Sequence, residues 1–310
     1  MFKKISFLTL LMSIFLLASC QNSNTASNNN DGLTIVTTIA QIADVATNVG
    51  GSAVTVDPLM GPGADPHLYS PSAGDVNRLQ SADVIFYNGL FLEAQMEDIL
   101  EQLGEDKTVV AVAGTISESL LLDSEDYEDE FDPHIWFDIA LWAEATEVIR
   151  DTLIEADPDN AETYTANAEA YLAELAELDE WVESEISRIP AEQRVLITAH
   201  DAFNYFGNAY GMEVMGLQGI STAAEAGTAD VQRLADFIAE NEIRAIFVES
   251  SVSERNVEAV QAAVSSRGWE VEIGGSLFSD AMGEAGTPQG TYIGTVRHNV
   301  DTIVPALLGE

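Results

Sequence analysis

Three of the four histidines in this sequence have similar surroundings and could share one chemical task. His67 and His134 each lie in a segment that reads Asp-Pro-His-x-aromatic, and His200 lies in Thr-Ala-His-Asp-Ala-Phe. Any one of them alone would more often be a turn or core histidine. Three with such similar placement are rarely incidental, and neutral imidazole nitrogens are good ligands for a borderline divalent metal ion. The three segments together therefore predict a metal site.

Other residues limit the chemistry of that site. The one cysteine, Cys20, lies close to the N-terminus, so no thiolate ligand is expected. His298 lies in the last helical pattern, matches none of the three segments and is expected to be structural or at the surface. The chain has no His-Glu-x-x-His, no Gly-x-Ser-x-Gly and no phosphate-binding loop, which argues against a hydrolase or a nucleotide site.

Short β-branched runs alternate with helical patterns in the first part of the chain. This alternation predicts parallel strands covered by helices on both faces. The histidines come where strands give way to loops, the edge at which open α/β sheets bind ligands. Strands are expected at 33–38, 54–56, 84–87 and 108–112, and helices at 39–48, 72–79 and 90–103.

One long helical pattern at 157–190 interrupts the alternation. Its apolar residues recur at four- and three-residue steps, which predicts one buried stripe. About thirty helical residues would span about 45 Å and act as a stiff connector. The stripe consists of Tyr164, Ala168, Tyr171, Leu175, Leu178 and Val182.

The alternation then resumes. Strands are expected at 195–198, 213–215, 245–248 and 269–273, and helices at 230–241, 254–266 and 292–308. The sequence therefore predicts an α/β protein of two lobes, each a mostly parallel sheet flanked by helices, joined by the long helix. The predicted boundaries are 32–156 for the N-terminal lobe, 157–190 for the connecting helix and 191–310 for the C-terminal lobe.

The first residues predict export. Lys3 and Lys4 precede an apolar run too short to span a bilayer, which indicates a signal peptide at 1–19. The segment Leu-Ala-Ser-Cys resembles a bacterial lipobox and makes Cys20 the expected lipidation site, with an ordinary secretory signal as the alternative. Residues 20–31, rich in Asn and Ser, are expected to form a flexible tether. We therefore expect an extracytoplasmic lipoprotein, periplasmic or at the cell surface.

The formal net charge of −40 excludes some partners. Such an acidic surface repels nucleic acid and anionic lipid, so membrane contact is expected only through the lipid anchor. The acidic segment 124–132 is expected to be a solvated loop, with gathering of cations near the site as the alternative.

Five ordered motifs between residues 61 and 283 resemble the cluster A-I, or cluster 9, solute-binding proteins of bacterial zinc and manganese ABC importers. They are Asp-Pro-His-Leu-Tyr-Ser-Pro, Asp-Pro-His-Ile-Trp-Phe-Asp, Ala-His-Asp-Ala-Phe-Asn-Tyr-Phe, Phe-Val-Glu-Ser-Ser-Val and Ser-Leu-Phe-Ser-Asp-Ala-Met-Gly. The resemblance implies a cleft between the lobes in which His67, His134, His200 and Asp280 bind the metal. Asp201 and Glu249 are our candidates for orienting the imidazoles.

The implied function is capture of Zn²⁺ or Mn²⁺ by a monomer and delivery to an ABC import permease, without catalysis. A histidine at the third ligand position occurs in zinc receptors and in some manganese receptors of this family. The choice between the two metals therefore stays open. The alternatives are a zinc-dependent hydrolase, which would need an open coordination position, and an adhesin-type surface lipoprotein.

Overall fold

Parallel strands form the centre of the N-terminal half, as the alternation predicts. The computed structural model describes residues 32–124 and 130–310, and Gly32–Glu310 form one compact unit. Four strands, all paired in parallel, lie in the order β2-β1-β3-β4. They are β1 (Leu33–Thr37), β2 (Val54–Pro58), β3 (Val84–Tyr87) and β4 (Thr108–Ala111). The predicted signal peptide, Cys20 and the tether, together with residues 125–129 of the acidic loop, lie outside the described residues.

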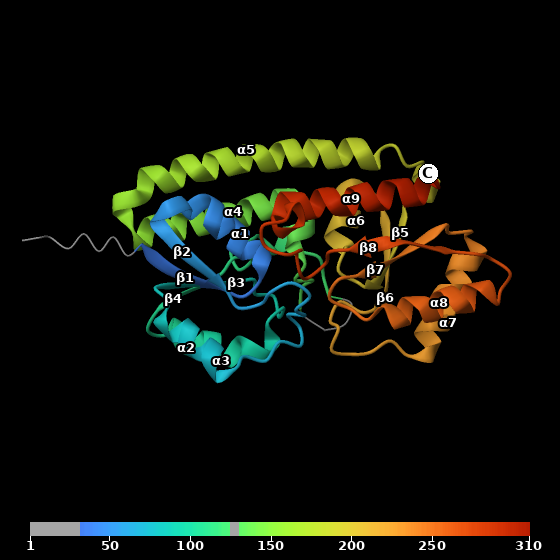
Figure 1. The fold of residues 1–310 in the computed structure, drawn as a ribbon, viewed down its shortest axis with the longest axis horizontal. Coiled ribbons are helices and arrows are strands. Elements are labelled where there is room, and N and C mark those ends of the chain that lie inside the picture. The colour runs from blue at the N-terminus through green and yellow to red at the C-terminus, as the bar shows by residue number, and fades with distance from the viewer. Residues whose placement is uncertain (1–31, 125–129) are drawn as a thin grey trace, which may run out of the picture. The chain divides into compact units, whose positions relative to one another are not determined.

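Helices cover both faces of this sheet (Figure 1). One face carries α1 (Ala40–Gly50) and α4 (Ile139–Ala156), and the other carries α2 (Ala73–Ser81) and α3 (Glu97–Gly104). Side chains fix where two of these helices begin. Ser72 and Asp75 form a capping box at α2, and the Asp138 carboxylate accepts the amide hydrogens of Ala140 and Leu141 at α4.

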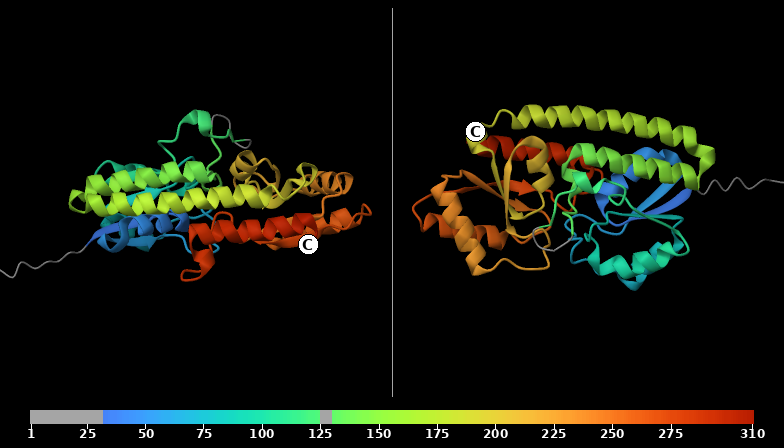
Figure 2. Two further views of the ribbon diagram at one scale, coloured as in Figure 1. Left: turned by 90° about the horizontal axis from the view of Figure 1, so that it is seen from above. Right: turned by 180° about the vertical axis from the view of Figure 1, so that it is seen from behind.

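The predicted long helix is present but shorter than its sequence pattern. The α-helix α5 runs from Ala161 to Ile186, preceded by a 3-10 turn at Pro158–Asn160. Its 26 residues span about 39 Å, and it runs alongside both halves (Figures 1 and 2). All six residues of the predicted stripe are buried. The helix ends before Pro190 because the proline ring cannot continue it.

The C-terminal half contains two parallel strand pairs. β5 (Val195–His200) pairs with β6 (Glu213–Gln218), and β7 (Ala245–Glu249) pairs with β8 (Glu272–Leu277). The helices of this half are α6 (Asn204–Tyr210), α7 (Thr228–Glu240), α8 (Glu254–Ser265) and α9 (Tyr292–Leu308). Within the described residues, the larger of two apolar core clusters draws residues from both halves, among them Ile35, Leu175, Phe203 and Val300.

Two predicted elements are misplaced. The helix expected at 90–103 begins only at Glu97, because Leu90 and Phe91 have left-handed φ angles of 54° and 65°. The strand expected at 269–273 instead spans Glu272–Leu277 and contains Gly274 and Gly275. Glycine is a poor strand former, but a Cβ at Gly274 would lie 2.8 Å from Ala306 of α9. That close packing of helix on strand is a tertiary requirement that the local pattern does not show.

No helix within 32–124 or 130–310 is long and apolar enough to cross a membrane.

Candidate metal centre

The four predicted ligands come together in the structure. One ligand atom from each of His67, His134, His200 and Asp280 can be chosen so that all four atoms lie within 4.8 Å of one another. All four residues are at most 5 % exposed. Two come from the N-terminal half and two from the C-terminal half, so the centre lies where the halves meet.

The distances suit a small ion with few ligands. Asp280 Oδ1 lies 3.3 Å from His134 Nε2, and Asp280 Oδ2 lies 3.3 Å from His200 Nε2. His67 Nε2 lies 3.4 Å from His134 Nε2 and 3.8 Å from Asp280 Oδ2. Zinc–nitrogen bonds of about 2.0–2.1 Å in a tetrahedron place neighbouring ligand atoms about 3.3–3.4 Å apart. These four contacts, which use both oxygens of Asp280, are therefore equal or close to the spacing that a tetrahedral ion requires, and one ligand atom from each residue can be chosen within 4.8 Å of the others.

The shared Asp-Pro-His motif forms the same local turn in both segments. Asp65 Oδ1 accepts the backbone amide hydrogen of His67 at 2.9 Å, and Asp132 Oδ1 accepts that of His134 at 2.9 Å. In both segments the aspartate closes a turn over the proline onto the amide two residues later. The turn fixes the backbone of each histidine without using the ring.

The other two residues stand at the carboxyl ends of strands. His200 is the last residue of β5, and Asp280 follows the end of β8 by three residues. Gly216 of β6 allows the neighbouring strand to approach, because a Cβ there would lie 2.5 Å from the backbone nitrogen of Asp201. Strand ends in a parallel arrangement thus place both residues at one edge.

Carboxylates stand behind two of the imidazoles. Asp132 Oδ1 lies 2.7 Å from His134 Nδ1, and Glu249 Oε2 lies 2.5 Å from His200 Nδ1. Glu249 also accepts the backbone amide hydrogen of His200 at 2.8 Å. A proton held on Nδ1 leaves the Nε2 lone pair directed at the centre, which is the arrangement that a metal-binding histidine needs.

Of the two residues expected to orient imidazoles, the structure places Glu249 against a ring. The hydrogen bonds described for Asp201 involve its backbone, and its orienting role stays a prediction. Asp132 was not among the predicted residues. The sequence did contain a pointer to it, because a carboxylate two residues before a histidine can reach both the amide and Nδ1 of that histidine.

The charges at the centre favour a cation. Burial lowers the pKa of His67 to about 3. Burial also opposes protonation of His134, but Asp132 and Asp280 outweigh it and raise the pKa to about 9. The pKa of His200 is likewise raised, against burial, by Glu249 and Asp280. The pKa of Asp280 is held well below its usual value because the three imidazoles outweigh its burial. Positive charge is thus stabilised at His134 and His200, whereas His67 stays neutral, the form in which an imidazole binds a metal ion.

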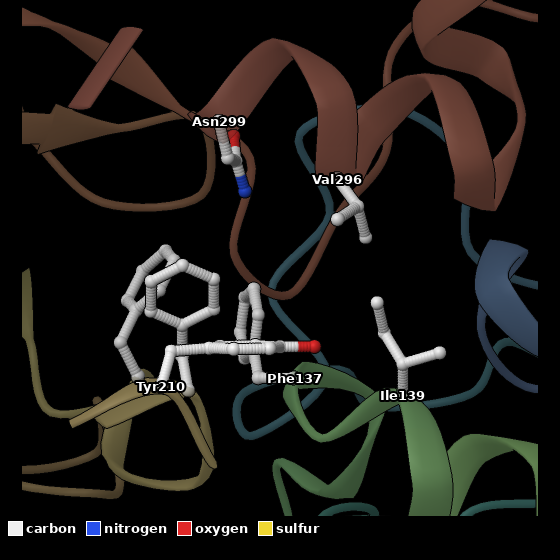
Figure 3. A pocket seen from close by; sticks show the side chains of 7 residues that line it. Phe137, Ile139, Tyr210, Val296 and Asn299 are labelled. Atoms are coloured by element: carbon white, nitrogen blue, oxygen red, sulfur yellow. The ribbon is translucent and has the colours of Figure 1, made fainter. Parts of the chain in front are cut away.

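Two cavities border this region. One of about 100 Å³ is lined by His67 together with Leu90, Phe91, Pro133 and Ile220. The other holds only about 10 Å³ and lies among Phe137, Ile139, Tyr210, Val296 and Asn299, which come from both halves (Figure 3). Phe137 and Phe203, each three residues after a site histidine, pack here at a tilt of 32° with ring centroids 4.2 Å apart. At this second cavity the interface is therefore apolar and nearly filled.

Comparisons with known proteins agree with this arrangement. The family model described as zinc-uptake complex component A, periplasmic, matches residues 35–306. The manganese-binding lipoprotein MntA of Bacillus subtilis is 48% identical over 297 residues, which cover 96% of this chain and 97% of that protein. The zinc-binding protein TroA of Treponema pallidum is 51% identical over 273 residues, 88% of each chain. The solved structure of the periplasmic zinc-binding protein TroA from Treponema pallidum superposes with a TM-score of 0.87, covering 89% of this chain and 99% of that one.

Proposed function

This chain belongs to the family of periplasmic zinc-uptake complex component A proteins, and we propose on that premise that it captures one divalent transition-metal ion for an ABC importer. The observation that carries the proposal is the convergence of three buried imidazoles and one buried carboxylate, two of the imidazoles backed by further carboxylates. We assign His67, His134, His200 and Asp280 as the ligands. Glu249 and Asp201 are assigned as residues that orient them.

The cargo is Zn²⁺ or Mn²⁺. Relatives carry names for either metal, so relatedness alone does not choose between them. Three nitrogen ligands and one carboxylate bind Zn²⁺ more tightly than Mn²⁺ by the Irving–Williams order. We therefore expect zinc to bind more tightly to the purified protein, whichever metal the importer delivers in the cell.

The ligand set supports transport rather than catalysis. A catalytic zinc site keeps one position open for water or substrate, beside a general base. Here four protein ligands can fill a tetrahedron, and each is almost fully buried. The names of the relatives describe binding proteins, and neither a hydrolase nor an adhesin is supported by them.

Binding between two halves gives capture a simple mechanism. We propose lobes at 32–156 and 191–310, with 157–190 as the connection between them. Each lobe supplies two ligands, so the ion bridges the lobes and its binding energy favours their contact. The −40 charge favours approach of cations and disfavours nucleic acid.

The cellular setting follows the same reasoning. We propose a monomer outside the cytoplasm, anchored through lipidated Cys20, that docks on a membrane permease. A relative with 48% identity is named a lipoprotein, which supports the anchor. Release of the ion would be driven by the ATP cycle of the transporter.

The test is the metal content of the stripped protein after it is offered equal Zn²⁺ and Mn²⁺, measured by mass spectrometry. One zinc per chain supports the proposed site and its intrinsic preference, and one manganese would show that the protein overrides that preference. His200→Ala should lose the ion. His298→Ala is the matched control, because His298 bonds the carbonyl oxygen of Ser276 and does not belong to the cluster. Retention of no metal by the unaltered protein would refute the proposal.

A further inference from the structure

Hydrogen bonds between the two halves end beside three of the four proposed ligands. In each case a neutral side chain of one half donates to a backbone or carboxylate oxygen of a ligand-bearing segment in the other half. The donors are Thr222, Asn204 and Gln41.

The first bond acts on the segment of His67. Thr222 lies in a turn of the C-terminal half, and its hydroxyl donates to Asp65 Oδ2 at 2.6 Å. The other oxygen of Asp65 holds the backbone amide of His67. Thr222 therefore fixes the carboxylate that fixes the ligand.

The second bond acts on His134. Asn204, the first residue of α6, donates through Nδ2 to Asp132 Oδ2 at 3.2 Å. Asp132 Oδ1 holds both the amide and the ring of His134. The neighbouring Tyr205 hydroxyl donates to the Asp132 carbonyl oxygen at 2.9 Å, so two residues of α6 form hydrogen bonds with Asp132.

The third bond runs in the opposite direction. Gln41 of α1 is 1 % exposed, and its Nε2 donates to the carbonyl oxygen of Asp280 at 3.0 Å. The indole of Trp136 donates to the carbonyl oxygen of Ser279 at 3.2 Å. Two side chains of the N-terminal half thus hold the backbone that carries a ligand of the C-terminal half.

We propose that Thr222, Asn204 and Gln41 are positioning residues that make the geometry of the metal ligands depend on contact between the halves. While the halves touch, each of these ligands is held by a residue from across the interface. When the halves separate, the three bonds break and His67, His134 and Asp280 lose part of their support. The ion then dissociates faster. This inference rests on the proposed metal-binding function.

The chemistry of the donors fits this role. A lysine or arginine at these positions would place a positive charge close to the ion and weaken its binding. A hydroxyl or amide orients a carboxylate or carbonyl without adding charge. His200 differs from the other ligands, because the contacts described for the carboxylate of its partner Glu249 are with His200 itself, in the same half.

The experiment measures the rate at which Zn²⁺ leaves the purified full-length protein when a chelator is added in excess. A single hydrogen bond corresponds to roughly a five- to tenfold change in rate. Thr222→Val, which removes only the hydroxyl function, should accelerate release by about that factor. Thr222→Ser, which keeps the hydroxyl, should stay within about twofold of the unaltered protein. Gln41→Met should also accelerate release.

The matched control is Gln261→Met. Gln261 Nε2 donates to the carbonyl oxygen of Val271 at 2.8 Å within the C-terminal half and touches no ligand segment. Its loss should leave the release rate within about twofold, even if it lowers the thermal stability of the metal-free protein. Thr222 lies in a turn, so its variants test the inference even if a methionine at position 41 impairs folding.

Four outcomes are decisive. Faster release in Thr222→Val with rescue in Thr222→Ser supports the inference. Unchanged release in Thr222→Val, or equal acceleration in Thr222→Ser and Thr222→Val, overturns it, since the hydroxyl would then have no part in holding the ion. If the unaltered protein retains no zinc, the proposed function itself fails and this inference fails with it.

Discussion

Asp132 and His134 form a closed unit in which one carboxylate oxygen holds both the backbone amide and the ring Nδ1 of the histidine, at 2.9 and 2.7 Å. The aspartate is completely buried, as is the histidine. The imidazole therefore has little freedom to rotate, and its Nε2 points to the centre.

This unit gives the first prediction. Asp132→Asn should weaken zinc binding about 10- to 100-fold, because an amide holds the Nδ1 proton less well and supplies less negative charge to the imidazole. Competition with a fluorescent chelator measures the affinity. The control is Asp138→Asn, which keeps an oxygen that can accept at the N-terminus of α4 and should leave both stability and affinity nearly unchanged. Equal affinity in Asp132→Asn and the unaltered protein would contradict the prediction.

Removal of the metal should lower thermal stability, because an ion that binds only the folded state stabilises it by mass action. At a free zinc concentration 1,000 times the dissociation constant, the gain is about 4 kcal/mol. For a chain of this size this corresponds to a rise in Tm of the order of 10 °C. Differential scanning calorimetry with zinc and with a chelator tests this. Asp280→Ala should abolish the rise, whereas His298→Ala should preserve it.

The thermal stability of the metal-free protein should fall with pH on both sides of about pH 6.5, and a different histidine is responsible on each side. The pKa of His134 is about 9 in the folded protein and 6.5 when unfolded, so its protonated form stabilises the metal-free protein below pH 6.5. That contribution is lost as the pH rises toward 9. The pKa of His67 is about 3 in the folded protein, so the unfolded chain takes up the proton more readily. The folded protein therefore loses stability as the pH falls from 6.5 toward 3.

The metal-free protein should consequently have its highest Tm near pH 6.5, as far as these histidines determine it. The zinc-bound protein needs neutral imidazoles, so the rise in Tm caused by zinc should grow between pH 6.5 and 9. Calorimetry at half-unit steps of pH, with and without zinc, measures both curves. A zinc effect that shrinks over this range would show that His134 does not exchange its proton for the ion.

Much of this site could be predicted from the sequence because the segments that form it are locally distinctive. His67 and His134 share a turn made by neighbouring residues, and β-branched runs mark β5 and β7. Asp280 could be identified as a ligand only from the family resemblance, since no local sequence pattern distinguishes it from the other acidic residues. The donors across the interface, such as Thr222 and Gln41, depend on contacts between residues 157 and 239 positions apart, which no local pattern contains.

The misplaced elements have the same physical origin. The residues that follow Leu90 and Phe91 favour a helix. The Glu93 carboxylate nevertheless accepts the backbone amide hydrogens of Asn88 and Gly89. This side-chain bonding competes with a helix start. Gly274 weakens the strand pattern, but α9 needs a residue without a Cβ there.

The acidity of the chain leads to a last prediction. Self-repulsion among carboxylates at a net charge of −40 opposes the compact state, and salt screens it. Raising NaCl from 0.05 to 1 M at pH 7.5 should stabilise the metal-free protein by about 1 kcal/mol or more, which is a rise in Tm of at least about 2 °C.

The control for the salt effect is a pH close to the sequence pI of about 4.1, where the net charge is small. If the salt acts by screening, the rise in Tm should nearly vanish there, whereas a general effect of NaCl on apolar burial would persist. A rise of equal size at both pH values would show that the acidic surface costs this fold little stability, and that its charges are spaced widely enough for water alone to screen them.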